Sequence, residues 1–185
     1  KAKSLAIVGF GGIGQMALKF AKPIYDEITI VSNSESKKQY AMENGAHNFV
    51  SHGEKVDDGF DIVLICSNGS IDINTLIETI APSGSIYLLG SWNKAAKLEI
   101  QSIEQVIEKE INIVGTNTGS PSMYQTLFAF VKRYNLNFDI EIKQPSELNY
   151  VFKELKESRP SKRFVIEITP DNLFDSTDKK SLYAN

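Results

Sequence analysis

The sequence is poor in the residues on which several kinds of protein depend. It has one cysteine, Cys66, which excludes an internal disulfide framework and suits a reducing compartment. A net charge of -3 offers no basic surface to nucleic acid, and no apolar run is long enough to cross a membrane. Because no secretory leader pattern is present either, we expect a cytoplasmic chain that binds neither nucleic acid nor membrane.

Metal ligands are also scarce. The sequence has two histidines, His47 and His52, besides Cys66, whereas a catalytic zinc takes about three protein ligands and keeps a fourth position open. Cys66 is expected to end a buried strand, and both histidines lie outside that strand. We therefore expect these residues to be structural or solvated, and we predict neither a metal site nor a catalytic residue in this chain.

The length and the order of the segments indicate one main domain with an appendage. The chain has 185 residues, of which 42% are hydrophobic, so it can bury a sizeable core. We expect the main domain over residues 1–137, a strand–helix–strand appendage over 138–168 and a polar tail over 169–185. Because the chain begins at Lys1 without an initiator methionine, we also expect it to be a piece of a longer protein.

Short apolar segments alternate with segments whose apolar residues recur at helical spacing. Strands are expected at residues 4–8, 27–31, 48–50, 61–66, 85–89, 111–114, 140–143 and 163–168. Helices are expected after the first strand and near residues 37–43, 71–80, 102–109, 121–134 and 147–157, with a turn at 82–84. This alternation predicts an α/β fold, a doubly wound parallel sheet with helices on both faces.

A glycine-rich turn follows the first expected strand. The pattern IVGFGGIG occupies residues 7–14. In such a turn Gly9 permits the tight bend, Gly11 lets the main chain approach a pyrophosphate, and Gly14 lets the helix pack close to the strand. The helix N-terminus adds N–H groups and a positive dipole end that favour an anion. The pattern predicts a dinucleotide-binding Rossmann unit, and a purely structural glycine turn is the alternative.

The end of the second expected strand bears on which dinucleotide binds. An acidic residue there would accept hydrogen bonds from the adenosine ribose and repel a 2′-phosphate, but this chain has Ser32. The run SNSESKK at residues 32–38 offers hydroxyls, an amide and two ammonium groups, which suit a phosphomonoester. We predict NADP, with NAD less favoured. One or two charge-assisted hydrogen bonds predict about a 10- to 100-fold preference.

A simpler interpretation of the same run stays open. In it, Ser34 or Ser36 caps the following helix while Lys37 and Lys38 lie in solvent. Glu35 favours this alternative, because it brings a negative charge into the run. The two lysines favour the phosphate, because positive charge in the first turn of a helix opposes the dipole unless an anion binds.

In combination, the segments resemble the cofactor domain of the medium-chain, zinc-dependent alcohol dehydrogenases, particularly the NADP-using branch similar to cinnamyl alcohol dehydrogenases. The resemblance covers most of the chain. It rests on GFGGIGQMALKFAK at 9–22, VSNSESKK at 31–38, ENGA at 43–46, FDIV at 60–63, PSG at 82–84, LLG at 88–90, IVGT at 113–116 and KRFVI at 162–166.

The resemblance implies reversible hydride transfer between NADP(H) and an alcohol or aldehyde that a catalytic zinc polarises. The zinc ligands of the family lie in an upstream domain that these residues do not include, so this chain alone is expected to be inactive. The resemblance also implies a homodimer formed through the region of residues 111–114, and a segment from 138 onward that returns to the catalytic domain. Arg163 resembles the family arginine that approaches the phosphates.

The cofactor site expected from the sheet edge and from the resemblance includes the glycine turn, the run after the second strand and the ends of later strands. The residues predicted to bind the cofactor are Gly9, Gly11, Gly12, Ile13, Gly14, Ser32, Asn33, Ser34, Lys37, Lys38, Cys66, Ser67, Gly90, Ser91, Gly115, Thr116, Asn117 and Arg163.

Three other classes of nucleotide-binding protein fit the sequence less well. No tyrosine has a lysine four residues later, which disfavours a short-chain dehydrogenase. A methyltransferase would prefer an acidic residue near Ser32 to hold the ribose of its cofactor. A non-catalytic nucleotide-sensing module is the strongest alternative, because it would also lack catalytic residues. It has no need, however, of the expected strand–helix–strand appendage.

Overall fold

The computed structural model describes residues 3–51, 54, 59–67, 72–89, 97–157 and 163–169. The chain divides into two units, Lys1–Asn137 and Phe138–Asn185, which are treated separately below. The strands of the first unit are β1 (Ser4–Val8), β2 (Glu27–Ser32), β3 (Asn48–Ser51), β4 (Phe60–Ile65), β5 (Ile80–Leu88) and β6 (Asn112–Gly115). Its helices are α1 (Gly12–Ala21), α2 (Lys38–Glu43), α3 (Ile73–Thr79), α4 (Ile103–Glu108) and α5 (Pro121–Arg133), with a 3₁₀ turn η1 (Glu35–Lys37).

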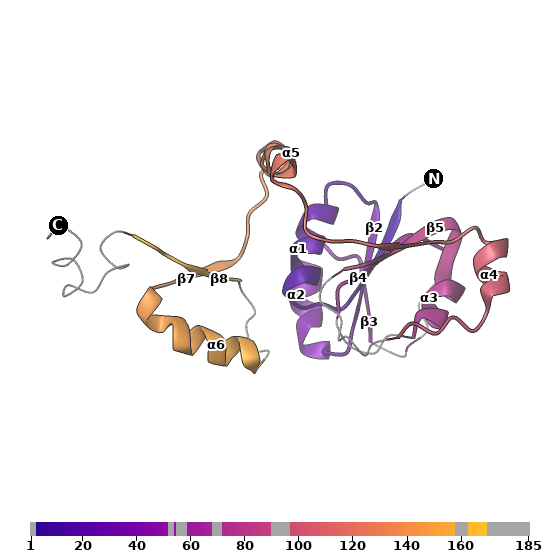
Figure 1. The fold of residues 1–185 in the computed structure, drawn as a ribbon, viewed down its shortest axis with the longest axis horizontal. Coiled ribbons are helices and arrows are strands. Elements are labelled where there is room, and N and C mark those ends of the chain that lie inside the picture. The colour runs from indigo at the N-terminus through magenta and orange to yellow at the C-terminus, as the bar shows by residue number, and fades with distance from the viewer. Residues whose placement is uncertain are drawn as a thin grey trace, which may run out of the picture. The chain divides into compact units, whose positions relative to one another are not determined.

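The strands of the first unit form one six-stranded sheet in the order β3-β2-β1-β4-β5-β6. Every neighbouring pair in it is parallel. Helices α1 and α2 cover one face, and α3 and α4 cover the other (Figure 1). The predicted α/β fold with a doubly wound parallel sheet is therefore confirmed. The chain builds outward from β1 to β3 and then restarts at β4 beside β1. The C-terminal ends of β1 and β4 therefore form a topological switch point, where open α/β sheets have their ligand-binding crevice.

The core explains why β1 reads as a continuous apolar run. Successive side chains of a strand point to opposite faces of the sheet. Leu5 and Ile7 lie in the core under α1 and α2, whereas Ala6 and Val8 lie in the core under α3. All four are at most 3% exposed. Because both faces are covered, the strand needs apolar residues at each of the positions 5–8.

One sequence-based expectation about the fold is wrong. The turn predicted at residues 82–84 lies inside β5, which already begins at Ile80. Ser83 does adopt a positive φ of 62°, but its N–H donates to the carbonyl of Lys109 at 2.6 Å instead of closing a turn. The pairing of β5 with β4 shifts register between Phe60 and Ile62, so the irregularity is absorbed as a bulge.

The second unit contains β7 (Ile140–Lys143), a 3₁₀ turn η2 (Pro145–Glu147), α6 (Leu148–Lys156) and β8 (Arg163–Ile166). Strands β7 and β8 pair in parallel, which requires a crossover connection that contains α6. A capping box formed by Gln144 and Glu147 opens η2 just before α6, and Tyr150 meets the ring of Phe164 edge-on. The predicted order of elements in the appendage, a strand, a helix and a second strand, is therefore confirmed.

Residues 170–185 of the expected polar tail lie outside the described residues. In the part of the chain that the structure describes, no helix is long and apolar enough to span a membrane.

Candidate functional site

The glycine turn (residues 9–14) leaves β1 at the crevice between β1 and β4. The N–H of Gly9 donates to the carbonyl of Val31 at 2.8 Å, which ties the start of the turn to β2. Gly9 has a φ of 94°, a conformation that side chains disfavour. A Cβ atom at this position would lie 2.6 Å from the Cβ of Ser67, the second residue after β4. The conformation and the close approach together require glycine here.

The other two glycines of the motif differ in their surroundings. A Cβ on Gly14 would press against the carbonyl oxygen of Gly9, so α1 packs directly on the turn. Gly11 precedes α1 with a φ of -87°, and nothing lies within 4 Å of the position its Cβ would take. The protein's own packing therefore needs Gly9 and Gly14, whereas Gly11 faces open space at the start of a helix. The first N–H groups of a helix lack partners within it and attract anions.

The end of β4 forms the other wall of the crevice. The N–H of Cys66 donates to the carbonyl of Val8 at 2.8 Å, which holds the two strand ends together. The Cys66 side chain is buried, and burial raises the pKa of its thiol to about 12. The thiol is therefore protonated at neutral pH, which makes it a poor nucleophile and a poor metal ligand.

The histidines do not join Cys66. The Nδ1 of His47 accepts the main-chain N–H of Ile28 at 3.0 Å, and the main-chain N–H of His47 donates to the carbonyl of Ile28 at 2.8 Å. This imidazole is thus fixed near the start of β2, at the end of the strand opposite to Ser32. His52 lies outside the described residues. Among the residues that are described, no group of three or more His, Cys, Asp or Glu side chains could hold a metal ion.

The β2 loop (residues 32–38) meets the glycine turn through a hydrogen bond. Ser32 is buried, and its Oγ accepts the N–H of Ser34 at 3.3 Å. The hydroxyls of Ser34 and Ser36 lie 3.0 Å apart. Lys37 donates from Nζ to the main-chain carbonyl of Phe10, inside the glycine turn, at 3.1 Å. The structure therefore brings together the two segments predicted to hold the pyrophosphate and the 2′-phosphate.

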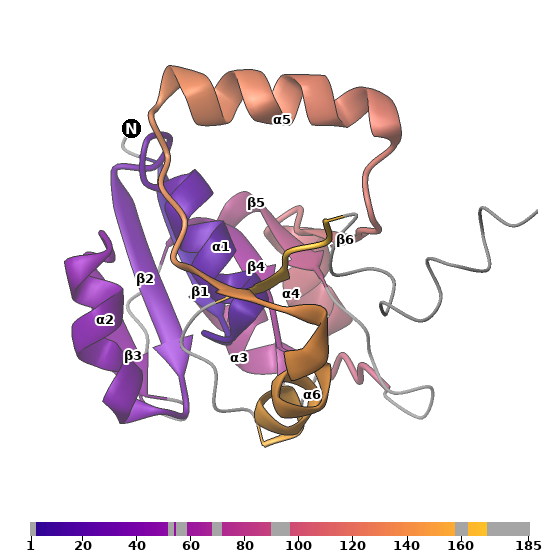
Figure 2. The same ribbon diagram turned by 90° about the vertical axis from the view of Figure 1, so that its left-hand side faces the viewer.

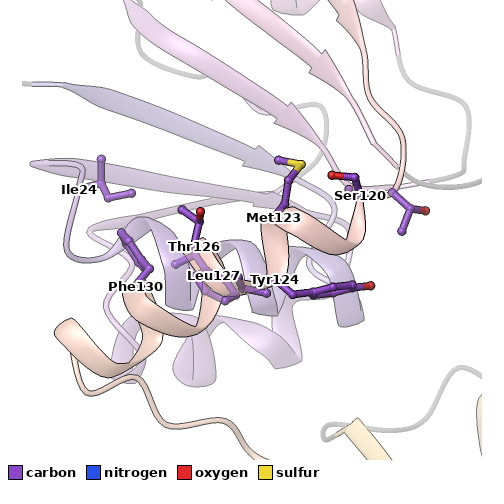
Figure 3. Close-up of a pocket in the computed structure, with 10 residues that line it drawn as sticks. Ile24, Ser120, Met123, Tyr124, Thr126, Leu127 and Phe130 are labelled. Carbon is purple, nitrogen blue, oxygen red and sulfur yellow. The ribbon is translucent and has the colours of Figure 1, made fainter.

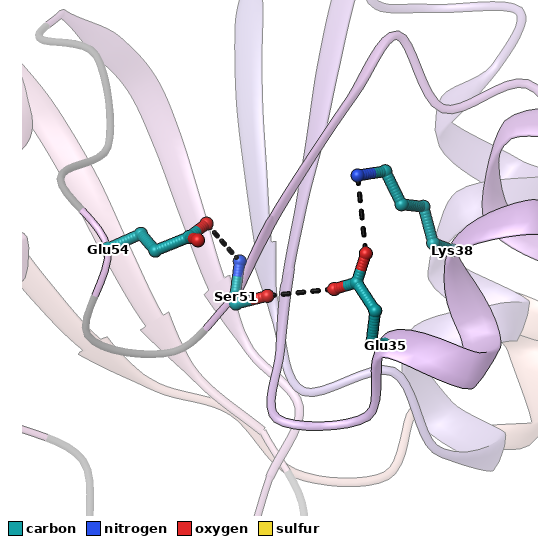
Figure 4. Close-up of polar contacts among 4 residues, drawn as sticks. All are labelled: Glu35, Lys38, Ser51 and Glu54. Carbon is teal, nitrogen blue, oxygen red and sulfur yellow. Dashed lines mark hydrogen bonds and ion pairs between the residues drawn. The ribbon is translucent and has the colours of Figure 1, made fainter.

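The remaining charged groups of the β2 loop form a contact that the sequence analysis missed (Figure 4). Nζ of Lys38 lies 3.3 Å from Oε1 of Glu35, and the hydroxyl of Ser51 donates to Oε2 of Glu35 at 2.9 Å. The N–H of Ser51 donates to Glu54 at 3.0 Å. The hydrogen bond from Ser51, and next Lys38, lower the pKa of the Glu35 carboxyl. Ser51 is the last residue of β3 and pairs with Ser32 in the register of β2 and β3, whereas the third expected strand ended one residue earlier, at 50.

The ends of β5 and β6 form the far part of the same sheet edge. Thr116 donates from both its N–H and its Oγ1 to the carbonyl of Leu88, at 3.1 and 3.0 Å. Asn117 accepts the N–H of Thr118 on its Oδ1 at 2.7 Å. A Cβ on Gly115 would meet nothing within 4 Å. These residues follow β6 with exposed side chains, and their contact with a cofactor stays a prediction.

For four further predicted site residues, the described contacts give no support for a place in the cofactor site. Gly90 and Ser91 lie outside the described residues. Arg163 is exposed on β8, in the second unit, and Asn33 is exposed in the β2 loop. Their assignment to the cofactor site stays a prediction.

An apolar pocket of about 500 Å³ lies elsewhere in the first unit, between α1 and α5 (Figure 3). Phe20 and Ile24 come from the end of α1 and the turn after it, and Met123, Leu127 and Phe130 come from α5. None of its lining residues is charged, so it does not suit a phosphate. Helix α5 lies near the C-terminal end of α1, where the rings of Phe20 and Phe130 are 6.0 Å apart, whereas the glycine turn is at the start of α1 (Figure 2).

A glycine turn at the switch point of a six-stranded parallel sheet invites comparison with known proteins. Residues 12–133, more than half of the chain, match the family described as zinc-binding dehydrogenase. The chain belongs to this family. Its cofactor-binding domain is the part that the match covers, as the resemblance implied.

Individual relatives agree with the family. An 18-hydroxynorfluorocurarine reductase from Strychnos nux-vomica is 31% identical over 172 residues, which cover 89% of this chain and 45% of the relative. A cinnamyl alcohol dehydrogenase from Sorghum bicolor has a TM-score of 0.83 at 25% identity, covering 94% of this chain and 50% of that one. The CAD of Helicobacter pylori, solved with NADP(H), has a TM-score of 0.77 at 21% identity, covering 90% and 48%.

The chain spans about half the length of the curated relatives that it matches. The match therefore establishes the cofactor-binding domain of an oxidoreductase of the zinc-binding dehydrogenase family. The activity of a whole protein, its substrate and its partners belong to the proposal that follows.

Proposed function

We propose that this chain is the cofactor-binding part of an NADP-dependent alcohol dehydrogenase or aldehyde reductase. The observation that carries the proposal is the hydrogen bond from Nζ of Lys37 to the carbonyl of Phe10. It joins a glycine turn suited to a pyrophosphate with a loop of hydroxyl and ammonium groups suited to a 2′-phosphate. Because both segments lie at one sheet edge, a single dinucleotide can span them.

Each segment has its own task in this proposal. The N–H groups at the start of α1 bind the pyrophosphate, and the missing side chain of Gly11 leaves room for its approach. Ser34, Lys37 and Lys38 bind the 2′-phosphate. Residues at the ends of β5 and β6 face the nicotinamide. When bound, the nicotinamide supplies or accepts the hydride.

The rest of the proposal concerns a longer protein. The zinc, the proton relay and the alcohol or aldehyde site belong to the part of the relatives' length that this chain does not span, so this chain alone is inactive. We also propose a cytoplasmic homodimer that pairs through β6, because β6 forms one edge of the sheet. In such a protein the second unit returns to the catalytic domain. This unit disfavours a nucleotide-sensing module, which has no need of it.

Calorimetric titration of the 185-residue chain with NADPH and with NADH, at one salt concentration, tests the proposal. We expect NADPH to bind about tenfold more tightly or better, since one charge-assisted hydrogen bond has roughly that effect. The Lys37→Ala/Lys38→Ala double variant should lose this preference. A Lys153→Ala/Lys156→Ala variant is the matched control, because it removes the same charge from exposed positions on α6.

The outcomes separate the parts of the proposal. Equal affinities for NADPH and NADH would contradict the choice of NADP and leave dinucleotide binding intact. Failure of both cofactors to bind the correctly folded chain would contradict the proposal as a whole.

A further inference from the structure

We propose that Glu35 is a specificity-determining residue that limits the affinity of the β2 loop for a 2′-phosphate. The inference rests on the proposed function of the same site and names a residue that acts against it. In this account Glu35 holds groups that would otherwise bind the phosphate, and the protein binds NADPH less tightly than its two lysines allow.

The argument begins with what Glu35 touches. One carboxylate oxygen lies 3.3 Å from the ammonium of Lys38, and the other accepts the hydroxyl of Ser51 at 2.9 Å (Figure 4). A 2′-phosphate needs the same kinds of partner, an ammonium group and hydroxyl donors. Glu35 therefore occupies, with its own oxygens, two donors at the place where the phosphate is proposed to bind.

The position of these groups makes the competition direct. Ser51 is the last residue of β3 and lies opposite Ser32, the last residue of β2. The choice between a ribose hydroxyl and a 2′-phosphate is made at the end of β2. Glu35 reaches across this strand end from the start of η1. A phosphate that approaches Lys38 must displace the carboxylate or accept a like charge beside it.

The charge balance of the region points the same way. The region holds two ammonium groups, from Lys37 and Lys38, and two carboxylates, from Glu35 and Glu54, which both accept hydrogen bonds from Ser51. The ammonium of Lys38 pairs with Glu35, whereas that of Lys37 donates to the carbonyl of Phe10. Glu54 accepts a main-chain N–H, a donor that the phosphate does not need to capture. Of the two carboxylates, only Glu35 is paired with an ammonium group in the described contacts, so its removal leaves Lys38 free to bind a phosphate.

Calorimetry with two small probes tests the effect: 2′,5′-ADP carries one phosphate at the 2′ position and one at the 5′ position, whereas 5′-ADP carries a 2′-hydroxyl and both of its phosphates at the 5′ end. Wild type and variant are compared for each probe separately. We expect Glu35→Gln to strengthen binding of 2′,5′-ADP by about three- to tenfold, since it removes a like charge at an exposed site. Binding of 5′-ADP should stay unchanged or weaken. Glu43→Gln is the matched control, because it removes the same charge from an exposed position at the end of α2, the helix that follows η1, where the carboxylate accepts a hydrogen bond from Gln39.

A second background tests the mechanism. In a Lys38→Ala chain, Glu35→Gln should give little further gain in 2′,5′-ADP affinity, because no ammonium remains to be freed. Both variants should fold, since Glu35 and Lys38 are exposed at 63% and 54% of their side chains. Thermal unfolding of each variant checks this before titration.

The failures can be told apart. If Glu35→Gln strengthens the binding of both probes equally, the variant acts through the net charge of the protein and not through the 2′-phosphate, and the inference is wrong. If it weakens 2′,5′-ADP, Glu35 positions Lys38 for the phosphate, which also overturns the inference. A third outcome is that wild type binds 2′,5′-ADP no more tightly than 5′-ADP, while Glu35→Gln creates a preference for 2′,5′-ADP. In that case the inference about Glu35 holds and the choice of NADP for the wild-type chain fails. If no variant binds either probe, the proposed function fails first.

Discussion

The glycine turn and the β2 loop lie at the same edge of one sheet, yet they are built in opposite ways. The turn depends on missing side chains, since the backbone of Gly9 touches Ser67 and α1 packs on its carbonyl. The β2 loop depends on side chains that are present and mostly exposed, held by Lys38, Glu35 and Ser51. One segment is fixed by sterics and the other by exchangeable polar contacts.

This difference separates what each segment can specify. A backbone turn on a helix N-terminus recognises a pyrophosphate, which every dinucleotide carries. Exposed polar side chains can change without disturbing the fold, because their contacts with each other contribute little to stability. The turn therefore defines the class of ligand, and the β2 loop defines which member of the class binds. The predictions below test this division, from the largest expected effect to the smallest.

Gly14→Ala should damage both the fold and ligand binding. The added methyl group would meet the carbonyl oxygen of Gly9, and overpacking of this kind costs about 1–3 kcal/mol of unfolding free energy. Urea unfolding should show the loss, and calorimetry should show that NADPH and NADH are affected alike. A variant as stable as wild type would mean that α1 does not pack on the turn.

The Cys66 thiol should react slowly with iodoacetamide at pH 8 in the folded chain. Burial raises its pKa to about 12, so the folded thiol stays protonated while an unfolded thiol, with an ordinary pKa of 9.0, begins to ionise. The resulting contribution to stability is complete below pH 9 and is lost as the pH rises from 9 toward 12. Labelling in urea is the control. Equally fast labelling of the folded chain would show that the crevice beside the glycine turn opens readily.

Gly11→Ala should separate binding from folding within the turn. The new methyl group has open space around it and an ordinary φ, so the unfolding midpoint should stay close to that of wild type. It would stand where the pyrophosphate approaches, and we expect about a tenfold loss of affinity for both cofactors. Undiminished affinity would place the pyrophosphate elsewhere.

Lys38→Ala should leave the melting temperature unchanged. Its ion pair with Glu35 is exposed to solvent, and such pairs rarely stabilise a fold measurably. A clear drop in the melting temperature by calorimetric scanning would show that the β2 loop, like the turn, is part of the structural framework.

The same division explains how much the sequence could predict. The glycine motif follows from a local pattern, and β1 begins and ends as expected, because a run of four apolar residues such as 5–8 is typical of a strand covered on both faces. Gly45, just after α2, has a positive φ of 107°, which is common for a glycine at a helix end.

Long-range contacts were the part that could not be predicted. The bond from Lys37 to Phe10 joins residues 27 apart in the sequence, and Ser51 meets Glu35 across 16. Periodicity and composition carry no signal for such pairs of exposed side chains. The bulge in β5 was not predicted for a related reason. The N–H of Ser83 donates to the carbonyl of Lys109, which lies at the end of α4, far away in the sequence.

The central claim is that one dinucleotide uses both the glycine turn and the β2 loop. The most direct test is to follow the backbone amide signals of the isotopically labelled chain by NMR during titration with NADPH and, separately, with NADH. We predict that both cofactors shift the amides of residues 9–14 strongly, and that NADPH shifts those of residues 32–38 more than NADH does. Shifts that avoid the glycine turn, or that gather at the apolar pocket between α1 and α5, would contradict the account.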